Sequence, residues 1–157
     1  MQKITPFLWF DGNAEEAVNF YTSVFGNSKV VSIKRYPGGP MEGKILTAVF
    51  ELEGQAFMAI DGGPHYTFSG AISLYVDCAS QDEVDRLWEK LTADGEVLMC
   101  GWCTDKFGVT WQIIPSALIK LMNDPDQEKA GRVMDAMLKM KKIDVPTLER
   151  AYEGVEV

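Results

Sequence analysis

One helix-forming pattern occurs twice in the chain. It is first seen in Asn13-Ala14-Glu15-Glu16-Ala17-Val18, and Ser80-Gln81-Asp82-Glu83-Val84 repeats it 67 residues further along. Each copy opens with a residue that favours the N-cap of a helix and carries Glu three places later. This is the capping-box pattern, in which the two side chains satisfy free backbone N–H groups of the first turn. Apolar residues follow at helical spacing in both copies. A unit of this length that occurs only twice indicates a duplicated module rather than a solenoid.

The elements around each helix follow one order, strand–helix–three strands, which predicts two βαβββ modules. In the first module (residues 1–61) we expect a helix over 13–25 and strands over 4–10, 29–36, 45–53 and 56–61. In the second (71–115) we expect a helix over 81–92 and strands over 71–77, 96–100, 102–104 and 109–115. A Gly- and Pro-containing linker, 62–70, joins them into a single domain, 1–115.

Residues 116–157 are predicted to form a C-terminal helical extension. A short helix is expected over 116–122 and a last one over 146–152. Between them, Asp124 is placed as the N-cap of a helix that begins at Pro125 and runs to about Met140. The methionines of that helix, Met134, Met137 and Met140, are interpreted as a packing or dimer stripe.

Composition narrows the class of protein. With 46% hydrophobic and 11% aromatic residues among 157, the chain has enough apolar side chains for a core. The net charge of -8 disfavours nucleic acid and anionic membrane surfaces as partners. No apolar run approaches the ~20 residues of a membrane span, and no secretory leader is recognisable. Three cysteines do not fit a disulfide scaffold, so we expect a cytoplasmic protein.

Seven segments carry a resemblance to known proteins and together span nearly the whole chain: Thr5–Gly12, Glu16–Tyr21, Gly62–Pro64, Cys100–Trp102, Asp105–Gly108, Trp111–Ile113 and Val133–Lys142. In combination they resemble the vicinal oxygen chelate superfamily, which includes glyoxalase I, bleomycin-resistance proteins and extradiol dioxygenases. Within it the chain is similar to the PhnB-like branch labelled 3-demethylubiquinone-9 3-methyltransferase. The resemblance implies an α+β fold, in which the two modules form an open, eight-stranded, glyoxalase-like β-cup with helices outside. It also implies a homodimer.

The same resemblance implies four positions for the ligands of a divalent metal, on the first and last strand of each module. Here they fall on Pro6, Ala71, Gln112 and the stretch 57–61, in which only Asp61 is a ligand type. Pro6 and Ala71 offer no side-chain donor. The single histidine, His65, cannot complete a site built on several imidazoles. We therefore expect no metal.

The family label implies a methyl donor such as S-adenosylmethionine. The common fold for that cofactor places a Gly-rich turn between a strand and a helix. Here the strand-to-helix turn is Asp11-Gly12-Asn13, and Gly62-Gly63-Pro64 precedes a strand instead. We expect no bound cofactor, and whether the chain is an enzyme stays open. The alternative to a binding protein is methyl transfer, or a metal-dependent lyase or dioxygenase activity.

The run Cys100-Gly101-Trp102-Cys103 is a Cys-x-x-Cys motif. A redox pair needs a helix N-terminus or another cationic group that lowers a thiol pKa, and no helix is expected after this motif. A zinc site needs two further ligands, and only Cys78 and His65 remain. The pattern favours small buried apolar side chains, and leaves a redox role of Cys100 and Cys103 undecided.

The remaining hypothesis is a metal-free protein that binds a small organic molecule in its β-cup. The pocket candidates are Trp9, Asp61, Tyr75, Cys100, Trp102 and Gln112. Two points stay open. Alternation along 109–115 places either Gln112 or Trp111 toward the cup, with the other beneath a helix. Asp61 fits either a turn or a carboxylate at the rim of the cup.

Overall fold

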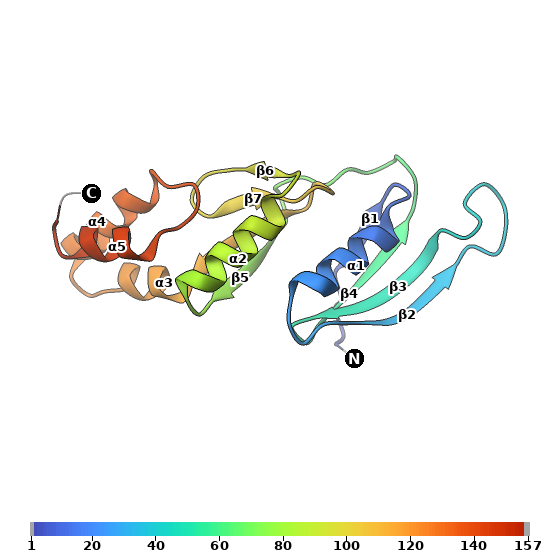
Figure 1. The fold of residues 1–157 in the computed structure, drawn as a ribbon, viewed down its shortest axis with the longest axis horizontal. Coiled ribbons are helices and arrows are strands. Elements are labelled where there is room, and N and C mark those ends of the chain that lie inside the picture. The colour runs from blue at the N-terminus through green and yellow to red at the C-terminus, as the bar shows by residue number, and fades with distance from the viewer. Residues whose placement is uncertain (1, 156–157) are drawn as a thin grey trace. The chain divides into compact units, whose positions relative to one another are not determined.

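The computed structural model describes residues 2–155, which divide into two compact units. The first unit runs to Phe68 and the second begins at Ser69. Each contains one four-stranded sheet with a helix against one of its faces (Figure 1). The units are described in turn.

The first unit contains β1 (Phe7–Phe10), α1 (Ala14–Val24), β2 (Lys29–Arg35), β3 (Ile45–Leu52) and β4 (Gln55–Asp61). The strand order is β1-β4-β3-β2, with β1 parallel to β4 and the other pairs antiparallel. Alternate residues of β3 and β4 are buried against α1, and the Phe50 and Phe57 rings stack there, 5.5 Å apart. Strand register places Phe7, Met58 and Val49 in one row on the opposite face. No element of this unit covers that row, and Phe7 is 50% exposed.

The second unit repeats the order with β5 (Ser73–Cys78), α2 (Gln81–Thr92), β6 (Glu96–Val97), β7 (Trp102–Thr104) and β8 (Thr110–Pro115). Its sheet has the order β5-β8-β7-β6, with β5 parallel to β8. The helix α2 packs on β5, β7 and β8. It buries Trp111 and Ile113 of β8, because alternate side chains of a strand point to the same face.

The C-terminal extension belongs to the second unit and comprises α3 (Ser116–Met122), α4 (Gln127–Met137) and α5 (Val145–Tyr152). Its helices pack on one another around an apolar cluster that also contains Ile114 of β8. The other members are Leu118, Val133, Ala136, Ile143, Leu148 and Ala151. The extension is thus joined to the end of the sheet by a continuous core.

The predicted α+β class, with two sheets of four strands and terminal helices, is confirmed. Several local predictions were wrong. β1 begins at Phe7 rather than Ile4, β6 ends at Val97 rather than Cys100, and α4 ends at Met137 rather than near Met140. The N-cap of α4 is Asp126, whose carboxylate accepts from the N–H groups of Glu128 and Lys129.

The two capping boxes also differ. Ser80 accepts from the N–H of Glu83, as predicted, although the Glu83 carboxylate returns to the N–H of Ala79 rather than to that of Ser80. Asn13 makes no capping bond through its side chain, and the first N–H of the helix, that of Ala14, donates to Asp61 instead.

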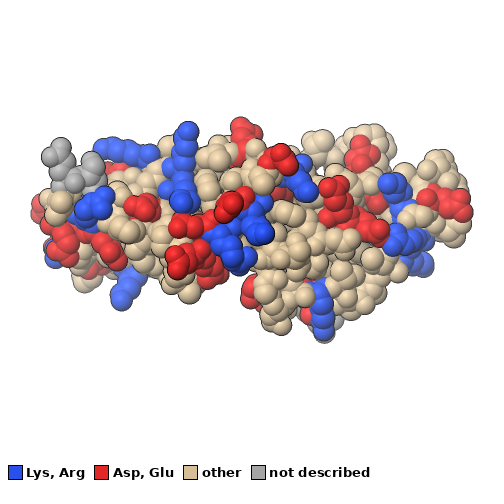
Figure 2. All heavy atoms as spheres, viewed as in Figure 1, with Lys and Arg blue, Asp and Glu red and all other residues tan. Residues whose placement is uncertain are grey.

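Two surface properties bear on partners. None of the helices within residues 2–155 is long and apolar enough to cross a bilayer. On the face drawn in Figure 2, acidic and basic side chains are interspersed, and the described residues form no continuous basic patch there. A nucleic-acid backbone is held by such patches.

Candidate functional site

Three predicted site residues lie side by side on the sheet of the second unit. Tyr75 of β5 pairs with Gln112 of β8, and Gln112 pairs in turn with Trp102 of β7. Neighbouring strands lie about 4.8 Å apart, so the three Cα atoms span about 10 Å. The row lies on the face opposite α2, and we call this surface the open face. It places an amide between two aromatic rings.

The orientation of Gln112 is fixed by the residues on either side of it. Trp111 is 2% exposed beneath α2, and its indole Nε1 donates to Asp105 at 2.9 Å. Asp105 is also buried and accepts from the N–H groups of Phe107 and Val109. Because Trp111 is anchored in this way, Gln112 must point to the open face. Of the two arrangements that the sequence allowed, the structure therefore has Gln112 partly buried on the open face and Trp111 packed beneath α2.

The polar groups of the row are neutral. Gln112 donates through Nε2 to the Ser73 hydroxyl at 2.9 Å, which sets the rotamer of the amide. Burial, followed by the nearby charges of Asp77 and Cys78, raises the pKa of Tyr75, so its hydroxyl keeps its proton at neutral pH. Such a row can stack a flat molecule and exchange hydrogen bonds with it. The row itself contains no carboxylate or imidazole; the nearby carboxylate on the same face of β5 is that of Asp77, which accepts from the Ser116 hydroxyl at 2.7 Å.

Cys100 lies in the turn that leads into β7, two residues before Trp102. It is partly buried and has a left-handed backbone conformation, with φ of 58°. Its partner in the Cys-x-x-Cys motif, Cys103, is fully buried on the face beneath α2. Burial, with a smaller effect from Asp105, raises the pKa of the Cys103 thiol to about 12. Cys103 is therefore a thiol rather than a thiolate at neutral pH, and is unsuited to redox exchange.

Trp9 and Asp61 belong to the first unit, where they lie on opposite faces of its sheet. The Trp9 indole donates to the carbonyl of Gly63 at 2.8 Å, and its ring contacts Tyr66 edge-on at 5.0 Å. A Cβ on Gly62 would lie 2.2 Å from this ring, so the stretch after β4 packs directly against Trp9. The ring is thus held within its own unit.

Asp61 is 1% exposed on the face beneath α1. One of its carboxylate oxygens accepts from the N–H of Ala14 and the other from the N–H of Ile45, both at 2.9 Å. These contacts tie α1 and β3 to the end of β4. The geometry is that of a helix cap and strand anchor, and it gives Asp61 a structural role.

A pocket of about 290 Å³ lies beside Asp61 in the first unit. It is lined by Gly12, Glu15, Arg35, Glu42, Gly43, Lys44, Ile45 and Asp61. Its cations are engaged by the protein itself. Arg35 pairs with Glu15 and donates to the carbonyl of Gly43, and Lys44 donates to the carbonyl of Gly12. Sequence reasoning missed this pocket, because its residues come from four separate segments.

The donor set does not fit a superfamily-type metal. Both oxygens of Asp61 are bonded to backbone N–H groups, and Pro6 and Ala71 have no side-chain donor, so of the four implied positions only Gln112 could offer an oxygen ligand. Within residues 2–155 no group of three or more His, Cys, Asp or Glu side chains could hold an ion. His65 lies exposed in the segment between the two sheets.

A nucleotide-type cofactor does not fit either. Such cofactors use the free N–H groups at the N-terminus of a helix. At α1 the N–H of Ala14 is taken by Asp61, and at α2 that of Glu83 is taken by Ser80. Neither strand-to-helix turn, Asp11-Gly12-Asn13 or Cys78-Ala79-Ser80, has the Gly-rich sequence that the common fold uses for S-adenosylmethionine.

The structure therefore brings Tyr75, Gln112 and Trp102 together, with Cys100 in the adjoining turn, and keeps Trp9 and Asp61 in the other unit. Sequence reasoning missed Ser73 and Asp105, which orient Gln112 and Trp111. The signal for Asp105 was present, because Asp105-Lys106-Phe107-Gly108 reads as a turn and Asp bonds to backbone N–H groups within turns.

Comparison with known proteins agrees with this architecture. Residues 2–114 match the sequence profile of the family described as 3-demethylubiquinone-9 3-methyltransferase. A Bacillus cereus PhnB protein, described as a putative 3-demethylubiquinone-9 3-methyltransferase, is 46% identical, with a TM-score of 0.68; the match covers 73% of this chain and 100% of that one. The Pseudomonas aeruginosa protein PA1353 is 27% identical, with a TM-score of 0.64, over 73% of this chain and 98% of that one.

A Staphylococcus aureus protein is 37% identical over 71% of this chain and 94% of that one, with a TM-score of 0.37. No curated protein matches. The resemblance drawn from the sequence is confirmed, and the chain belongs to the PhnB-like, 3-demethylubiquinone-9 3-methyltransferase family.

Proposed function

We propose that this protein binds a small, flat organic molecule on the open face of its second sheet, without a metal ion. The observation that carries the proposal is the cross-strand row of Tyr75, Gln112 and Trp102. Aromatic rings offer large apolar area in a rigid form, and a single amide between them supplies orientation through hydrogen bonds. The ligand class is therefore an aromatic or conjugated molecule with at least one polar substituent.

Binding is favoured over catalysis by the chemistry of the row. Tyr75 keeps its proton, Gln112 is neutral, and the thiol of Cys103 is buried on the opposite face of the sheet. A nucleophile needs a base within hydrogen-bond reach, and no such pair occurs in the row. The family description names a methyl transfer, but neither strand-to-helix turn has the Gly-rich sequence typical of sites for the methyl donor.

A fluorescence titration with 8-anilinonaphthalene-1-sulfonate tests the proposal, since this dye is flat and aromatic and carries one polar group. We expect one dye molecule to bind per chain. Trp102→Ala should weaken binding about tenfold, the equivalent of ~1.4 kcal/mol of lost ring contact. Trp88→Ala is the matched control, because Trp88 lies on α2 and is partly buried, on the side of the sheet away from the row. Its affinity should stay within twofold of the unmodified protein.

Two further measurements address the alternative activities. Elemental analysis of the purified protein and calorimetry with S-adenosylmethionine should show neither a stoichiometric metal nor tight cofactor binding. A stoichiometric metal would contradict the metal-free proposal, and micromolar cofactor binding would support methyl transfer instead. If Trp102→Ala and Trp88→Ala lose dye affinity equally, the proposal that the dye binds on the open face is contradicted.

A further inference from the structure

The segment Met140–Val145, which follows α4 and ends at the first residue of α5, contacts the turn that precedes Trp102. We call this segment the clasp. The carbonyl of Met140 accepts from the N–H of Cys100 at 2.8 Å, and the carbonyl of Lys141 accepts from the N–H of Gly101 at 2.7 Å. Two consecutive backbone bonds therefore tie the C-terminal extension to the entrance of β7.

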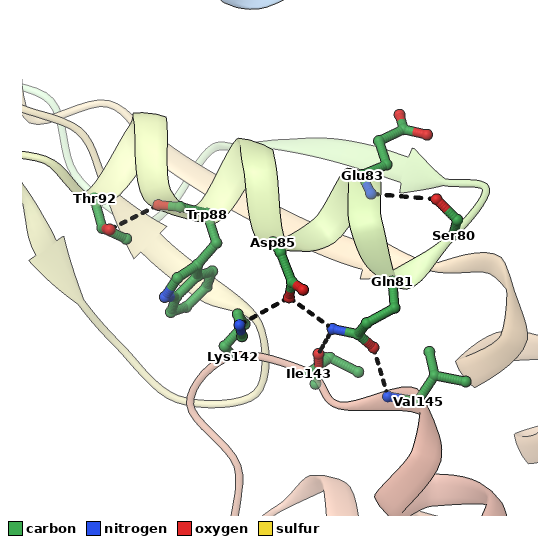
Figure 3. Close-up of polar contacts among 9 residues, drawn as sticks. All are labelled: Ser80, Gln81, Glu83, Asp85, Trp88, Thr92, Lys142, Ile143 and Val145. Atoms are coloured by element: carbon green, nitrogen blue, oxygen red, sulfur yellow. Dashed lines mark hydrogen bonds and ion pairs between the residues drawn. The ribbon is translucent and has the colours of Figure 1, made fainter.

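The other side of the clasp is fixed to α2, as Figure 3 shows. The amide of Gln81 donates through Nε2 to the carbonyl of Ile143 at 3.0 Å and accepts through Oε1 from the N–H of Val145 at 2.7 Å. Lys142 forms an ion pair with Asp85 at 2.7 Å. The hydrogen bond from Lys142, followed by that from Gln81, lowers the pKa of Asp85, so its carboxylate is charged at neutral pH. One helix thus holds the clasp at three points.

The turn itself depends on such support. Cys100 and Gly101 both have positive φ, 58° and 83°, and the left-handed region disfavours a residue with a side chain by about 1–2 kcal/mol. There is no room for a Cβ on Gly101, which would lie 2.8 Å from the Ile114 side chain and 3.0 Å from that of Ile143. Backbone bonds between Trp102 and Met99, and between Leu98 and Trp102, close the turn. The geometry of the turn therefore fixes the position of the Trp102 backbone.

The clasp also abuts the open face. Ile114 is two residues from Gln112 on the same side of β8, and it is buried in the cluster that includes Ile143. The clasp and the extension lie outside residues 2–114, the part that the family profile matches. The family profile therefore includes the second sheet, with Tyr75, Gln112 and Trp102, but it does not include the clasp.

We infer that the clasp positions Trp102, so that the contacts of Gln81 with the C-terminal extension set the ligand affinity of the open face. Gln81 acts as a positioning residue through the clasp and the turn at Cys100–Gly101, and itself touches no ligand. The inference rests on the proposed function for its effect on affinity, whereas its effect on Trp102 can be measured without a ligand.

The test uses the full chain with Gln81→Met, which keeps the side-chain length and removes all three hydrogen bonds of the amide, to Ile143, Val145 and Asp85. Protein labelled with 5-fluorotryptophan gives one ¹⁹F resonance for each of the four tryptophans, assigned by Trp→Phe variants. We expect the Trp102 resonance to shift or broaden while that of Trp9 stays in place. Hydrogen exchange at the Cys100 and Gly101 amides should accelerate, and dye affinity should fall about five- to tenfold, the lower end of usual coupling between sites.

Val84→Ala is the matched control, because Val84 is fully buried on α2 and has no contact with the clasp through hydrogen bonds or charge. It should lower the unfolding temperature at least as much as Gln81→Met, yet leave the Trp102 resonance and the dye affinity unchanged. Lys142→Met removes only the exposed ion pair and should produce the same changes as Gln81→Met on a smaller scale. It serves as the test variant should Gln81→Met not fold.

The outcomes separate the two proposals. If the Trp102 resonance is unaffected in both Gln81→Met and Lys142→Met, Gln81 does not position Trp102, regardless of the dye affinity of these variants. A shifted resonance with unchanged dye affinity overturns the claim that the clasp sets affinity. Failure of the unmodified protein to bind the dye, or of Trp102→Ala to weaken binding, overturns the proposed function, and the ¹⁹F shift alone then decides whether the clasp positions Trp102.

Discussion

At the scale of single residues, Asp61 shows how a predicted site residue can serve the fold. Its two carboxylate oxygens accept from the N–H groups of Ala14 and Ile45 in a buried setting. Asp61→Ala leaves both donors without a partner, and we expect a loss of about 3 kcal/mol in the free energy of unfolding. Asp61→Asn retains one oxygen acceptor and should lose less. Urea unfolding followed by circular dichroism measures both.

The exposed Asp11→Asn is the control for Asp61, since it lies in the same β1–α1 region and should change stability by less than ~0.5 kcal/mol. If Asp61→Ala also falls within that margin while the protein still folds, the carboxylate does not anchor α1 and β3, and a role in ligand binding becomes the better explanation.

The cysteines differ in their expected reactivity. Burial raises the pKa of both Cys78 and Cys103 to about 12, whereas Cys100 is only partly buried. Because the thiolate is the reactive form, iodoacetamide at pH 8 should modify Cys100 alone in the folded protein. Mass spectrometry of peptides after timed labelling measures this, and labelling in urea should reach all three cysteines. Rapid modification of Cys103 in the folded state would contradict its burial and reopen a redox role for the motif.

At the scale of elements, the turn between β6 and β7 has no freedom to accept a side chain. Gly101 and Gly39 have nearly the same φ, 83° and 82°, but only Gly101 lacks space, with Ile114 and Ile143 beside it. Gly39→Ala should therefore lose about 1 kcal/mol from backbone conformation alone. Gly101→Ala should lose about 2 kcal/mol more because its neighbours must move. Thermal unfolding of the two variants isolates the packing contribution, and equal losses would contradict it.

The elements that the sequence predicts well are those whose signals are local. The repeat separated by 67 residues predicted both helices, because apolar spacing and capping residues act within one element. The contact of Asp61 with the first N–H of α1, that of Ala14, could not be predicted in this way, since the two residues are 47 positions apart. For α4, two Asp residues flank Pro125; Asp126 caps the helix, while Asp124 accepts from the N–H of Asp126 and from the Tyr152 hydroxyl of α5.

The candidate site shows the same limit. Alternation along β8 reduced the choice to Gln112 or Trp111, but Asp105 decided it by bonding the Trp111 indole. The clasp could not be predicted from the sequence. Gln81 and Val145 are 64 residues apart, and no local sequence pattern indicates that they form a hydrogen bond. The sequence pattern within one strand or helix thus predicts that element, whereas the contacts between elements are known only from the structure.

At the scale of the whole molecule, the family resemblance implies a homodimer, and the first unit offers a physical reason for one. Its sheet leaves one face without a helix, and Phe7 on that face is 50% exposed. Burying apolar surface stabilises association by about 25 cal/mol per Å², and exposed patches of this kind are typical of interfaces. We expect light scattering to give twice the chain mass of 17.5 kDa at micromolar concentration.

Two charge substitutions locate that interface. Phe7→Glu places a charge on the open sheet face of the first unit and should shift the equilibrium toward the monomer, because an interfacial carboxylate must lose its hydration. Leu138→Glu is the control, since Leu138 follows α4 in the C-terminal extension and is 51% exposed. If Leu138→Glu dissociates the protein and Phe7→Glu does not, the dimer is built by the apolar stripe of the extension, the other use that the sequence allowed for Met134 and Met137. A monomeric unmodified protein would exclude both interfaces.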